Sequence, residues 1–398
     1  MNEVVTERAA TPSAVPFDAE KLDELLARAG IDALIVSSKH NIQHLLGGYR
    51  FFFFEHFDAI GVGRYVPLLV YQRGHAERTR YIGNGMERYE KELGALWAPD
   101  LVTAWYGPAS MRAAVEHLKR LGLGEKTIGI EPAFLGADAV DVLRAELPLA
   151  RVVDALVPLE RFRAVKTPQE LQYVREASDK VVEAMLTVIA GHGPGTSTRD
   201  LTEALRREEV LRGLEFDYCL ITAGRSHNRA PSDKLIWRDG DVLSVDSGGN
   251  CKGYIGDLCR MGIHGEPDAE LEDLLGEIEE IQQAARTPIK AGARGGDIFA
   301  AVEALLRRSP HANSLEFVAH GMGLISHEAP RLTSEAPVPY PADDAETPLQ
   351  AGMVLSIETT HPHPRGYIKL EDTVAVTTTG SEAYGDFGRG WNRGGTAL

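Results

Sequence analysis

The chain has 398 residues, which is enough for two domains at about 150 residues each and for a large buried core. It carries 42 Lys and Arg against 58 Asp and Glu, and the formal charge of -16 would repel nucleic acid and anionic lipid. With 43% apolar and 25% charged residues, the composition excludes general disorder and fibrous repeats. We therefore expect a soluble globular protein with no nucleic-acid partner and no membrane role.

The cysteines and the first residues of the chain indicate a cellular location. Cys219, Cys251 and Cys259 lie at no zinc-type spacing, and an odd number does not suggest a disulfide framework. Residues 1–15 contain acids and no signal-peptide core, and no later run approaches the roughly 20 apolar residues of a membrane span. We expect residues 1–15 to be a disordered tail and the protein to be cytoplasmic.

The first domain is predicted at residues 16–160. Helical periodicity in DAEKLDELLARAG, MRAAVEHLKRLG and DAVDVLRAEL alternates with strand-like runs in DALIVSS, VPLLVY, TIGIE and ARVVDA. This alternation predicts an α/β domain with a largely covered sheet. The run from Phe51 to Phe54 has two interpretations: a buried strand of this domain, or an aromatic wall that reaches a neighbouring subunit's active site.

A second domain is predicted at residues 161–398, after an extended linker at 156–166. Its first helix has a clear start, because Thr167 can cap it and Glu170 lies three residues later. Apolar residues then recur at helical spacing until Gly191 stops the run.

This domain contains an internal duplication. Residues 240–246 read GDVLSVD and residues 352–358 read GMVLSIE. Each segment leads through a turn to a returning strand with a second acid, Asp257 in the first copy and Glu371 in the second. Two helical segments, the second containing EAL, precede each copy. The repeat of helix, helix and hairpin predicts an α+β domain made of two related halves.

The acids of the two hairpins are candidate metal ligands. Asp246 and Asp257 are 11 residues apart around a turn predicted at 251–252, which would place them directly opposite on neighbouring strands, with Cβ atoms about 4.5 to 5.5 Å apart. Taken alone, such a pair could be two solvated surface charges. The second copy supplies Glu358 and Glu371, and four facing carboxylates would need a cation between them.

A nitrogen ligand is expected in the segment FVAHGMGLISHEAP, which contains His320 and His327. A lone histidine there would be a packing residue. Together with the four carboxylates, however, His320 completes an oxygen-rich set of five ligands that suits Mn, Co, Fe or Zn. Two divalent cations would neutralise four carboxylates before any hydroxide is added, so the charge count favours two metals over one.

Four motifs then point to a family. VDSGGN and GYIGDLCR, AHGMGLISHE, AGMVLSIET, and GYIKLEDTVAV occur in this order between about residues 161 and 377. The set resembles the pita-bread metallohydrolases, which include aminopeptidase P, prolidase, methionine aminopeptidase and the metal-free creatinase. KHNIQHLLGGY in the first domain is similar to the creatinase and prolidase branch. The resemblance implies a creatinase/prolidase-like α/β domain, a pita-bread catalytic domain and a homodimer.

The resemblance also implies roles for the five ligands. Asp246 would bind one metal, His320 and Glu358 would bind the other, and Asp257 and Glu371 would bridge both. Manganese is the expected metal, with Co, Zn or Fe as alternatives. A hydroxide bridging the metals would attack an amide carbon. Glu358 would orient that water or take its proton.

Two further histidines match the family outside the metal shell. His227, in TAGRSHNRAPSD, matches a histidine that contacts the substrate, although it could also be an ordinary loop residue. His327 matches the histidine that contacts the reacting carbonyl and would stabilise the oxyanion. One position departs from the family, because Glu316 stands four residues before His320, where prolidases carry another histidine.

The implied substrate is a short peptide with proline after the cleaved bond, which would make the protein an Xaa-Pro dipeptidase or aminopeptidase. Glu316 supports a second possibility, a hydrolase or lyase of the same fold that acts on an ectoine-like or guanidino C–N bond. A third is a binding protein on an inactive peptidase scaffold, against which the retention of all five ligands argues.

Overall fold

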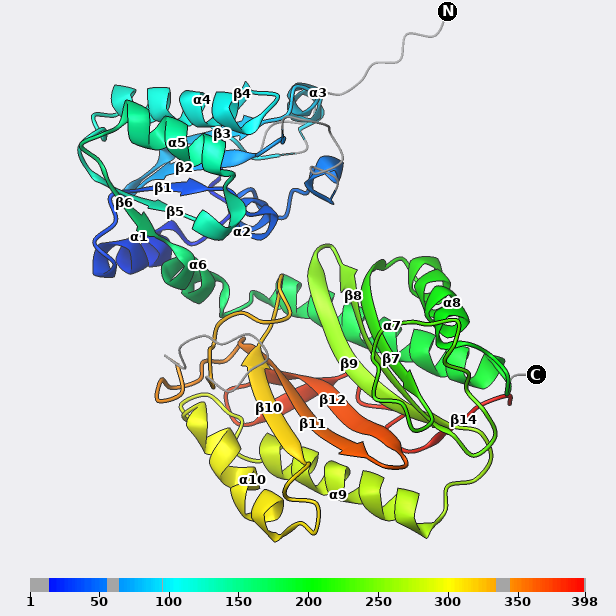
Figure 1. The fold of residues 1–398 in the computed structure, drawn as a ribbon. Helices are drawn as coiled ribbons and strands as arrows, with labels where there is room; N and C mark the ends of the chain where they lie inside the picture. Colours follow the sequence, from blue (N-terminus) through cyan, green and yellow to red (C-terminus); the bar gives the residue numbers. More distant parts are fainter. Residues whose placement is uncertain (1–13, 56–63, 95, 334–343, 397–398) are drawn as a thin grey trace, which may run out of the picture. The chain divides into compact units, whose positions relative to one another are not determined.

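The computed structural model divides into two compact units, the first ending at Arg163 and the second beginning at Ala164 (Figure 1). None of the helices among the described residues combines the length and the hydropathy that a membrane span requires. The structure describes residues 14–55, 64–94, 96–333 and 344–396, so most of the tail predicted at 1–15 lies outside the described residues.

The first unit is built on a mixed six-stranded sheet of order β4-β3-β2-β1-β5-β6. Its elements are α1 (Ala19–Arg28), β1 (Ala33–Val36), α2 (Lys39–Leu45), η1 (Phe52–Glu55), β2 (Leu68–Gln72), β3 (His75–Gly83), α3 (Glu87–Glu92), β4 (Asp100–Thr103), α4 (Gly107–Arg120), β5 (Thr127–Ile130), η3 (Pro132–Phe134), α5 (Ala137–Glu146), β6 (Arg151–Asp154) and α6 (Leu156–Arg163). In β1, Ala33 and Ile35 pack in a cluster with α4 and α5, whereas Leu34 and Val36 pack with α1 and α6. Because successive side chains of a strand point to opposite faces, the sheet is covered on both sides, which confirms the predicted α/β class.

Two local predictions in this unit are wrong. The expected extended linker is largely helical, since α6 buries Leu159 and Phe162, which lie three residues apart on one helical face. The run of four phenylalanines is not a strand, because η1 turns the chain there. Phe51 and Phe54 are buried in the core of the unit, while Phe52 is 59% exposed.

The second unit repeats one pattern of elements twice, which confirms the predicted duplication (Figure 1). Its elements are α7 (Pro168–Gly191), α8 (Thr198–Leu211), β7 (Glu215–Ala223), β8 (Val242–Cys251), β9 (Tyr254–Ile263), α9 (Ala269–Arg286), α10 (Gly296–Arg308), β10 (Glu316–Gly321), β11 (Val354–His363), β12 (Gly366–Val376), β13 (Ser381–Tyr384) and β14 (Asn392–Arg393). The sheet order is β10-β11-β12-β9-β8-β7, so the two hairpins meet at the central antiparallel pair β9 and β12.

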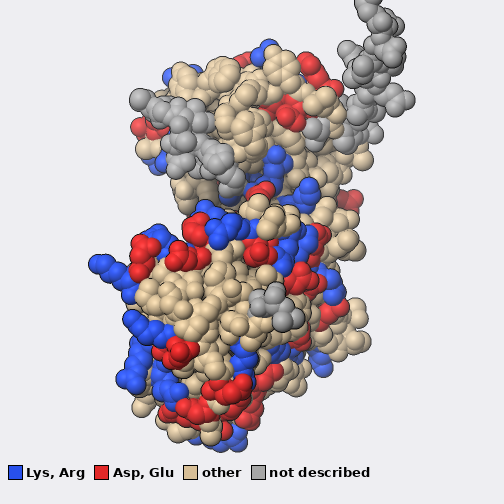
Figure 2. Space-filling view, turned by 90° about the vertical axis from the view of Figure 1, so that its right-hand side faces the viewer, with Lys and Arg blue, Asp and Glu red and all other residues tan. Residues whose placement is uncertain are grey.

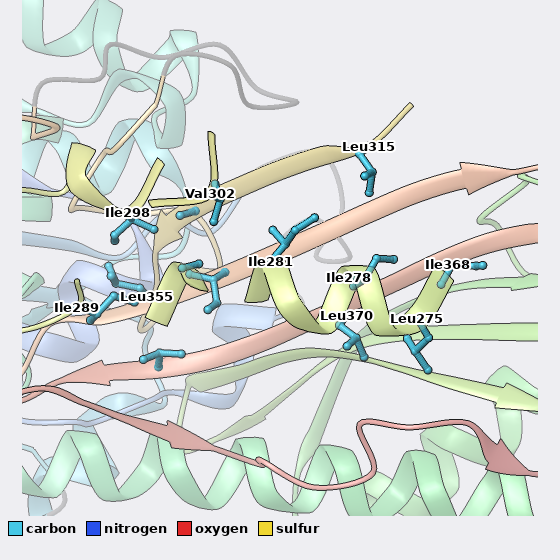
Figure 3. Packing of buried hydrophobic residues seen from close by; sticks show 14 of the residues in the cluster. Leu275, Ile278, Ile281, Ile289, Ile298, Val302, Leu315, Leu355, Ile368 and Leu370 are labelled. Carbon is cyan, nitrogen blue, oxygen red and sulfur yellow. The ribbon is translucent and has the colours of Figure 1, made fainter. Parts of the chain in front are cut away.

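Helices cover this sheet through apolar faces. In the second copy, α9 and α10 lie on β10, β11 and β12 (Figure 3). Leu275, Ile278 and Ile281 of α9 recur every three residues and pack in one cluster with Leu355 and Ile368 of the strands. In the first copy, α7 starts at the predicted capping box and packs on β8 and β9.

Gly256 of β9 permits the close approach of α7. A Cβ atom at this position would lie 2.5 Å from the backbone nitrogen of Ser178, which is too close for any side chain. The glycine therefore fixes how near the helix comes to the strand that carries Asp257.

The hairpin registers decide which acids face each other. Lys252 and Gly253 both have positive φ, 54° and 87°, as in a two-residue type I′ turn. Consequently Asp246 pairs with Cys259, and Asp257 pairs with Gly248. The prediction that the two aspartates lie directly opposite is wrong, because the turn lies one residue later than expected.

The face of the second unit that Figure 2 presents carries Lys and Arg side chains interspersed with Asp and Glu. Among the described residues of this face, the acidic excess of the composition is not gathered into a single broad patch.

Candidate metal centre

The five predicted ligands lie on five neighbouring strands of one sheet, and all but Glu358 are buried. They are Asp246 on β8, Asp257 on β9, His320 on β10, Glu358 on β11 and Glu371 on β12. Glu358 and Glu371 pair directly, while the two aspartates are diagonal neighbours. Residues far apart in the chain therefore converge on one part of the sheet.

Three of these side chains form a compact ligand group. One ligand atom each from Asp257, His320 and Glu371 lie within 4.8 Å of one another. His320 Nε2 is 4.0 Å from Glu371 Oε1, and this buried nitrogen has no hydrogen-bond partner among the described residues. A buried nitrogen without a partner is costly unless something else binds it. The group therefore fits a divalent cation.

The electrostatics of the group agree with this fit. Burial and the neighbouring Asp246 raise the pKa of Asp257. Burial and then Asp257 raise the pKa of Glu371 well above its usual value. Two adjacent buried carboxylates resist joint ionisation unless positive charge lies between them. A metal ion would supply that charge.

Hydroxyl groups orient the carboxylates. The Tyr218 hydroxyl donates to Asp257 Oδ1, and the Ser326 hydroxyl donates to Oδ2 at 2.8 Å. The Ser356 hydroxyl donates to Glu371 Oε1 at 2.8 Å. Such partners fix the orientation of metal ligands. These hydroxyl groups were not predicted from the sequence, although the two-residue spacing of Ser356 from Glu358 on β11 indicates that both side chains share a face.

Two basic residues that were not predicted from the sequence also lie in the site. Lys369 Nζ lies 2.7 Å from Asp246 Oδ2, 2.5 Å from Glu358 Oε2 and 2.7 Å from Glu371 Oε2. Arg229 Nη2 lies 2.5 Å from the same Asp246 Oδ2. Burial alone would raise the pKa of Glu358, but the nearby positive charges, above all Lys369, lower it to about 2. Of these two residues, only Lys369 could have been predicted from the sequence. It lies two residues before Glu371, so the two side chains share one face of the strand.

The two predicted catalytic histidines have different surroundings, and only His327 lies beside the ligand group. His327 stacks on His320 with ring centroids 3.8 Å apart, and its Nδ1 is buried with no hydrogen-bond partner among the described residues. Burial and His320 lower the pKa of His327 to about 4, so its ring is neutral at pH 7. His227 is exposed, and its Nε2 contacts the backbone oxygen of His363 at 3.0 Å. The described contacts do not join His227 to the carboxylates.

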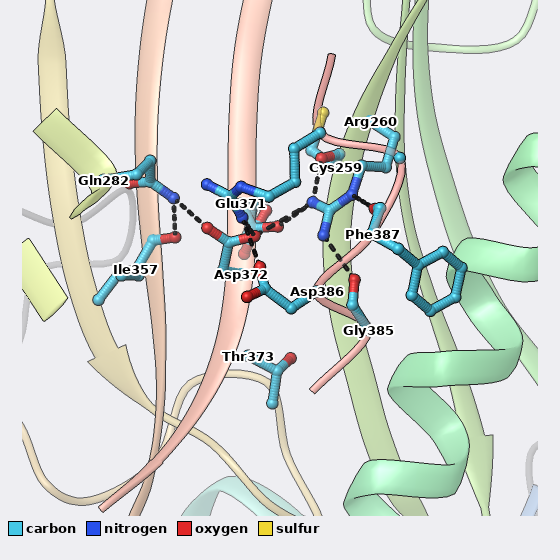
Figure 4. A network of polar contacts seen from close by, with 12 residues as sticks. Cys259, Arg260, Gln282, Ile357, Glu371, Asp372, Thr373, Gly385, Asp386 and Phe387 are labelled. Carbon is cyan, nitrogen blue, oxygen red and sulfur yellow. Dashed lines mark hydrogen bonds and ion pairs between the residues drawn. The ribbon is translucent and has the colours of Figure 1, made fainter. Parts of the chain in front are cut away.

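Buried ion pairs hold the site's strands and loop in place. Asp372, next to Glu371 on β12, contacts Arg260 at 3.2 Å (Figure 4). It also contacts Arg286 at 3.0 Å and Arg389 at 2.5 Å. Because adjacent side chains of a strand point to opposite faces, this network lies behind the ligand.

A second ion pair lies beside His327. Lys166 Nζ is 3.0 Å from Glu328 Oε1, and both side chains are buried. It joins the segment before α7 to the loop that carries the histidine.

The comparisons with known proteins identify the family. Residues 170–378 match metallopeptidase family M24, and residues 19–165 match the creatinase/prolidase N-terminal domain. The chain belongs to metallopeptidase family M24. It is therefore a metal-dependent hydrolase with the pita-bread fold, as the sequence resemblance implied.

Individual M24 relatives cover almost the whole chain. The Xaa-Pro dipeptidase of Pyrococcus horikoshii is 22% identical over 377 residues, 91% of this chain and 95% of the relative. The creatinase of a Bacillus species is 26% identical over 386 residues, 91% of this chain and 88% of the relative. The solved structure of an Xaa-Pro dipeptidase from Bacillus anthracis superposes with a TM-score of 0.76 at 20% identity, covering 94% of this chain and 98% of that one. This last likeness establishes the fold alone.

Proposed function

We propose that this M24 protein is an Xaa-Pro dipeptidase or aminopeptidase, which cleaves dipeptides or short peptides with proline after the scissile bond. The observation that carries the proposal is the buried group of Asp257, His320 and Glu371, with the unpartnered His320 Nε2 beside the neutral His327. The likeness to the Pyrococcus horikoshii Xaa-Pro dipeptidase supports proline as the residue after the bond.

The metal would be held by Asp257, His320 and Glu371, and the oxygen-rich set suits manganese, with Co, Zn or Fe as alternatives. When bound, such an ion lowers the pKa of a water molecule and polarises a carbonyl oxygen. The hydroxyl groups of Tyr218 and Ser356 keep the carboxylates oriented.

The remaining side chains would act on water and substrate. Glu358, kept ionised beside Lys369, can accept a hydrogen bond from the attacking water and orient it. The neutral His327 can donate an N–H to the carbonyl oxygen as negative charge develops there. His227, on the exposed loop beside Tyr367, is suited to hold the leaving side of the substrate.

A non-peptide substrate is the second candidate, and Glu316 favours it. This exposed acid lies on β10 four residues before His320, so both side chains share one face of the strand. An acid there would attract a cationic group such as a guanidinium or an amidinium. The likeness to the Bacillus creatinase supports this reading.

Release of free proline from a panel of Xaa-Pro dipeptides by the manganese-loaded enzyme tests the main proposal, with a chelated sample beside it. Fast release that chelation abolishes supports the dipeptidase. If the metal-loaded protein releases no proline but hydrolyses guanidino or amidine compounds, the second candidate replaces the first. A protein that takes up no metal and hydrolyses neither kind of compound would instead be a binding protein on this scaffold.

We also propose a cytoplasmic homodimer with no nucleic-acid partner. The three free, buried cysteines support a reducing compartment such as the cytoplasm. The charge of -16 would repel nucleic acid. Light scattering of the full chain tests the dimer, and a monomer mass would refute it.

A further inference from the structure

We infer that the centre binds one divalent metal ion, at Asp257, His320 and Glu371. The Lys369 ammonium takes the position that the family resemblance assigns to a second ion beside Asp246. The inference rests on the proposed function for the presence of any metal, and it changes the predicted stoichiometry from two to one.

The contacts of Lys369 are those of a bound cation. Its ammonium lies 2.5 to 2.7 Å from one oxygen each of Asp246, Glu358 and Glu371, which come from three different strands. An ammonium has three N–H donors, so these carboxylates can satisfy all of them. The side chain is 3% exposed, which leaves it little room to turn towards solvent.

The backbone gives Lys369 this position. It precedes Glu371 by two residues on β12, so both side chains point to the same face of the sheet. Its strand partner is Thr360, which follows Glu358 by two residues on β11. All four side chains therefore share a face, and the lysine reaches the acids without any distortion of the strands.

A second divalent ion would compete with this lysine for the same oxygens. Carboxylate oxygens bind such ions at about 2.0 to 2.2 Å, so an ion that shared Asp246 Oδ2 with the ammonium, 2.7 Å away, would lie within about 5 Å of that ammonium. The two cations would repel strongly in a buried site. Arg229 Nη2, 2.5 Å from the same oxygen, adds further positive charge.

Counting charges leads to the same number. Asp246, Asp257, Glu358 and Glu371 contribute four negative charges, and Lys369 with Arg229 contributes two positive charges. Four minus two leaves two negative charges, which one divalent ion balances. Before any hydroxide is added, two ions would leave an excess of two positive charges around the buried carboxylates, which is costly.

Metal content per chain is the measurement that tests this inference. The whole protein is loaded with manganese, dialysed and analysed by elemental mass spectrometry, together with Lys369→Met and the control Lys290→Met, which removes an exposed lysine of the same unit. We expect one manganese per chain in the wild type and in Lys290→Met. Lys369→Met should bind two, a twofold rise.

The outcomes separate this inference from the proposed function. Two ions per wild-type chain would refute the single-metal site and leave the dipeptidase proposal intact. No ion after reconstitution would refute both. One ion in both the wild type and Lys369→Met would refute the role of the lysine.

A spectroscopic measurement on the wild type alone covers the case in which Lys369→Met does not fold. Manganese is added in steps, and electron paramagnetic resonance distinguishes the spectrum of an isolated Mn(II) ion from that of an exchange-coupled pair. We expect only the isolated-ion spectrum at every ratio. A coupled spectrum would overturn the inference without any variant.

Discussion

In the hairpin of β8 and β9, Asp246 and Asp257 are diagonal neighbours, whereas in the hairpin of β11 and β12, Glu358 and Glu371 pair directly. The returning arms differ in length. In the first hairpin the returning arm begins to pair at Tyr254, three residues before Asp257. In the second hairpin it begins to pair at Gly366, five residues before Glu371. The duplicated backbone thus presents its acids in two different geometries.

The residues that flank the two returning acids differ in charge as well. Two residues before Asp257 is the buried Ile255, which packs in an apolar cluster, while Lys369 holds that position before Glu371. One residue after Asp257 is the buried Leu258, and after Glu371 it is the ion-paired Asp372. The first copy is therefore supported by packing and the second by charge.

The largest expected effect is the loss of the buried carboxylate of Asp372, which supports the second copy. Asp372→Ala leaves the guanidinium groups of Arg260, Arg286 and Arg389 without their shared buried carboxylate. We expect a loss of about 3 to 5 kcal/mol in the free energy of unfolding, measured by chemical denaturation. Leu258→Ala, at the matching position, should cost about 2 to 5 kcal/mol through a cavity. A loss below about 1 kcal/mol for Asp372→Ala would contradict the support by charge.

The two aspartates of the first hairpin should differ in metal binding. Asp257→Asn should lower metal affinity by more than about 100-fold and remove activity with it, because even the partners of metal ligands account for 10- to 100-fold. Asp246→Asn should keep its metal, since Asp246 faces Lys369 and Arg229. Calorimetric titration with manganese measures both affinities. Equal losses would show that both aspartates are ligands.

The hydroxyl groups behind the carboxylates should have smaller effects. Tyr218→Phe removes the donor to Asp257, and Ser356→Ala removes the donor to Glu371. We expect each change to lower metal affinity or kcat by about 10- to 100-fold, with little change in fold. Circular dichroism provides the control for folding. Wild-type affinity and kcat in both variants would mean that these hydroxyls do not orient the ligands.

The smallest expected effect is a pH dependence of stability in the first copy. Burial, followed by Asp217, raises the pKa of Glu209 to about 8, from 4.5. The folded protein then holds a proton that the unfolded chain releases, so Glu209 lowers stability progressively as the pH rises from about 4.5 to about 8. Glu209→Gln should raise the unfolding free energy above pH 8 by at least about 1.4 kcal/mol, with no gain near pH 4.5.

Thermal unfolding across this pH range measures the effect of Glu209→Gln. Glu203→Gln, an exposed change on the same helix, is the matched control and should follow the wild type. A gain that is equal at both ends of the range would contradict the raised pKa of Glu209.

The sequence by itself determined the features that depend on local pattern. The capping box of Thr167 and Glu170, the repeated GDVLSVD and GMVLSIE segments, and the alternation of the first domain predict elements that the structure contains. These signals can be read directly from the sequence, because caps and periodicity act over a few residues and a repeat is found by comparing two short segments. They were enough for the fold and the family.

Tertiary structure decided the charges around the metal centre. Arg229 lies 17 residues before Asp246 and reaches it only because the loop after β7 folds back, so that the Arg229 backbone oxygen accepts from the N–H of Ile221 on β7. Lys369 meets Asp246 because β12 and β9 join the two copies at the centre of the sheet. Contacts between distant segments depend on strand order, which no local pattern encodes. For that reason the sequence predicted a neutral cluster of two metals, while the folded chain supplies two of the positive charges itself.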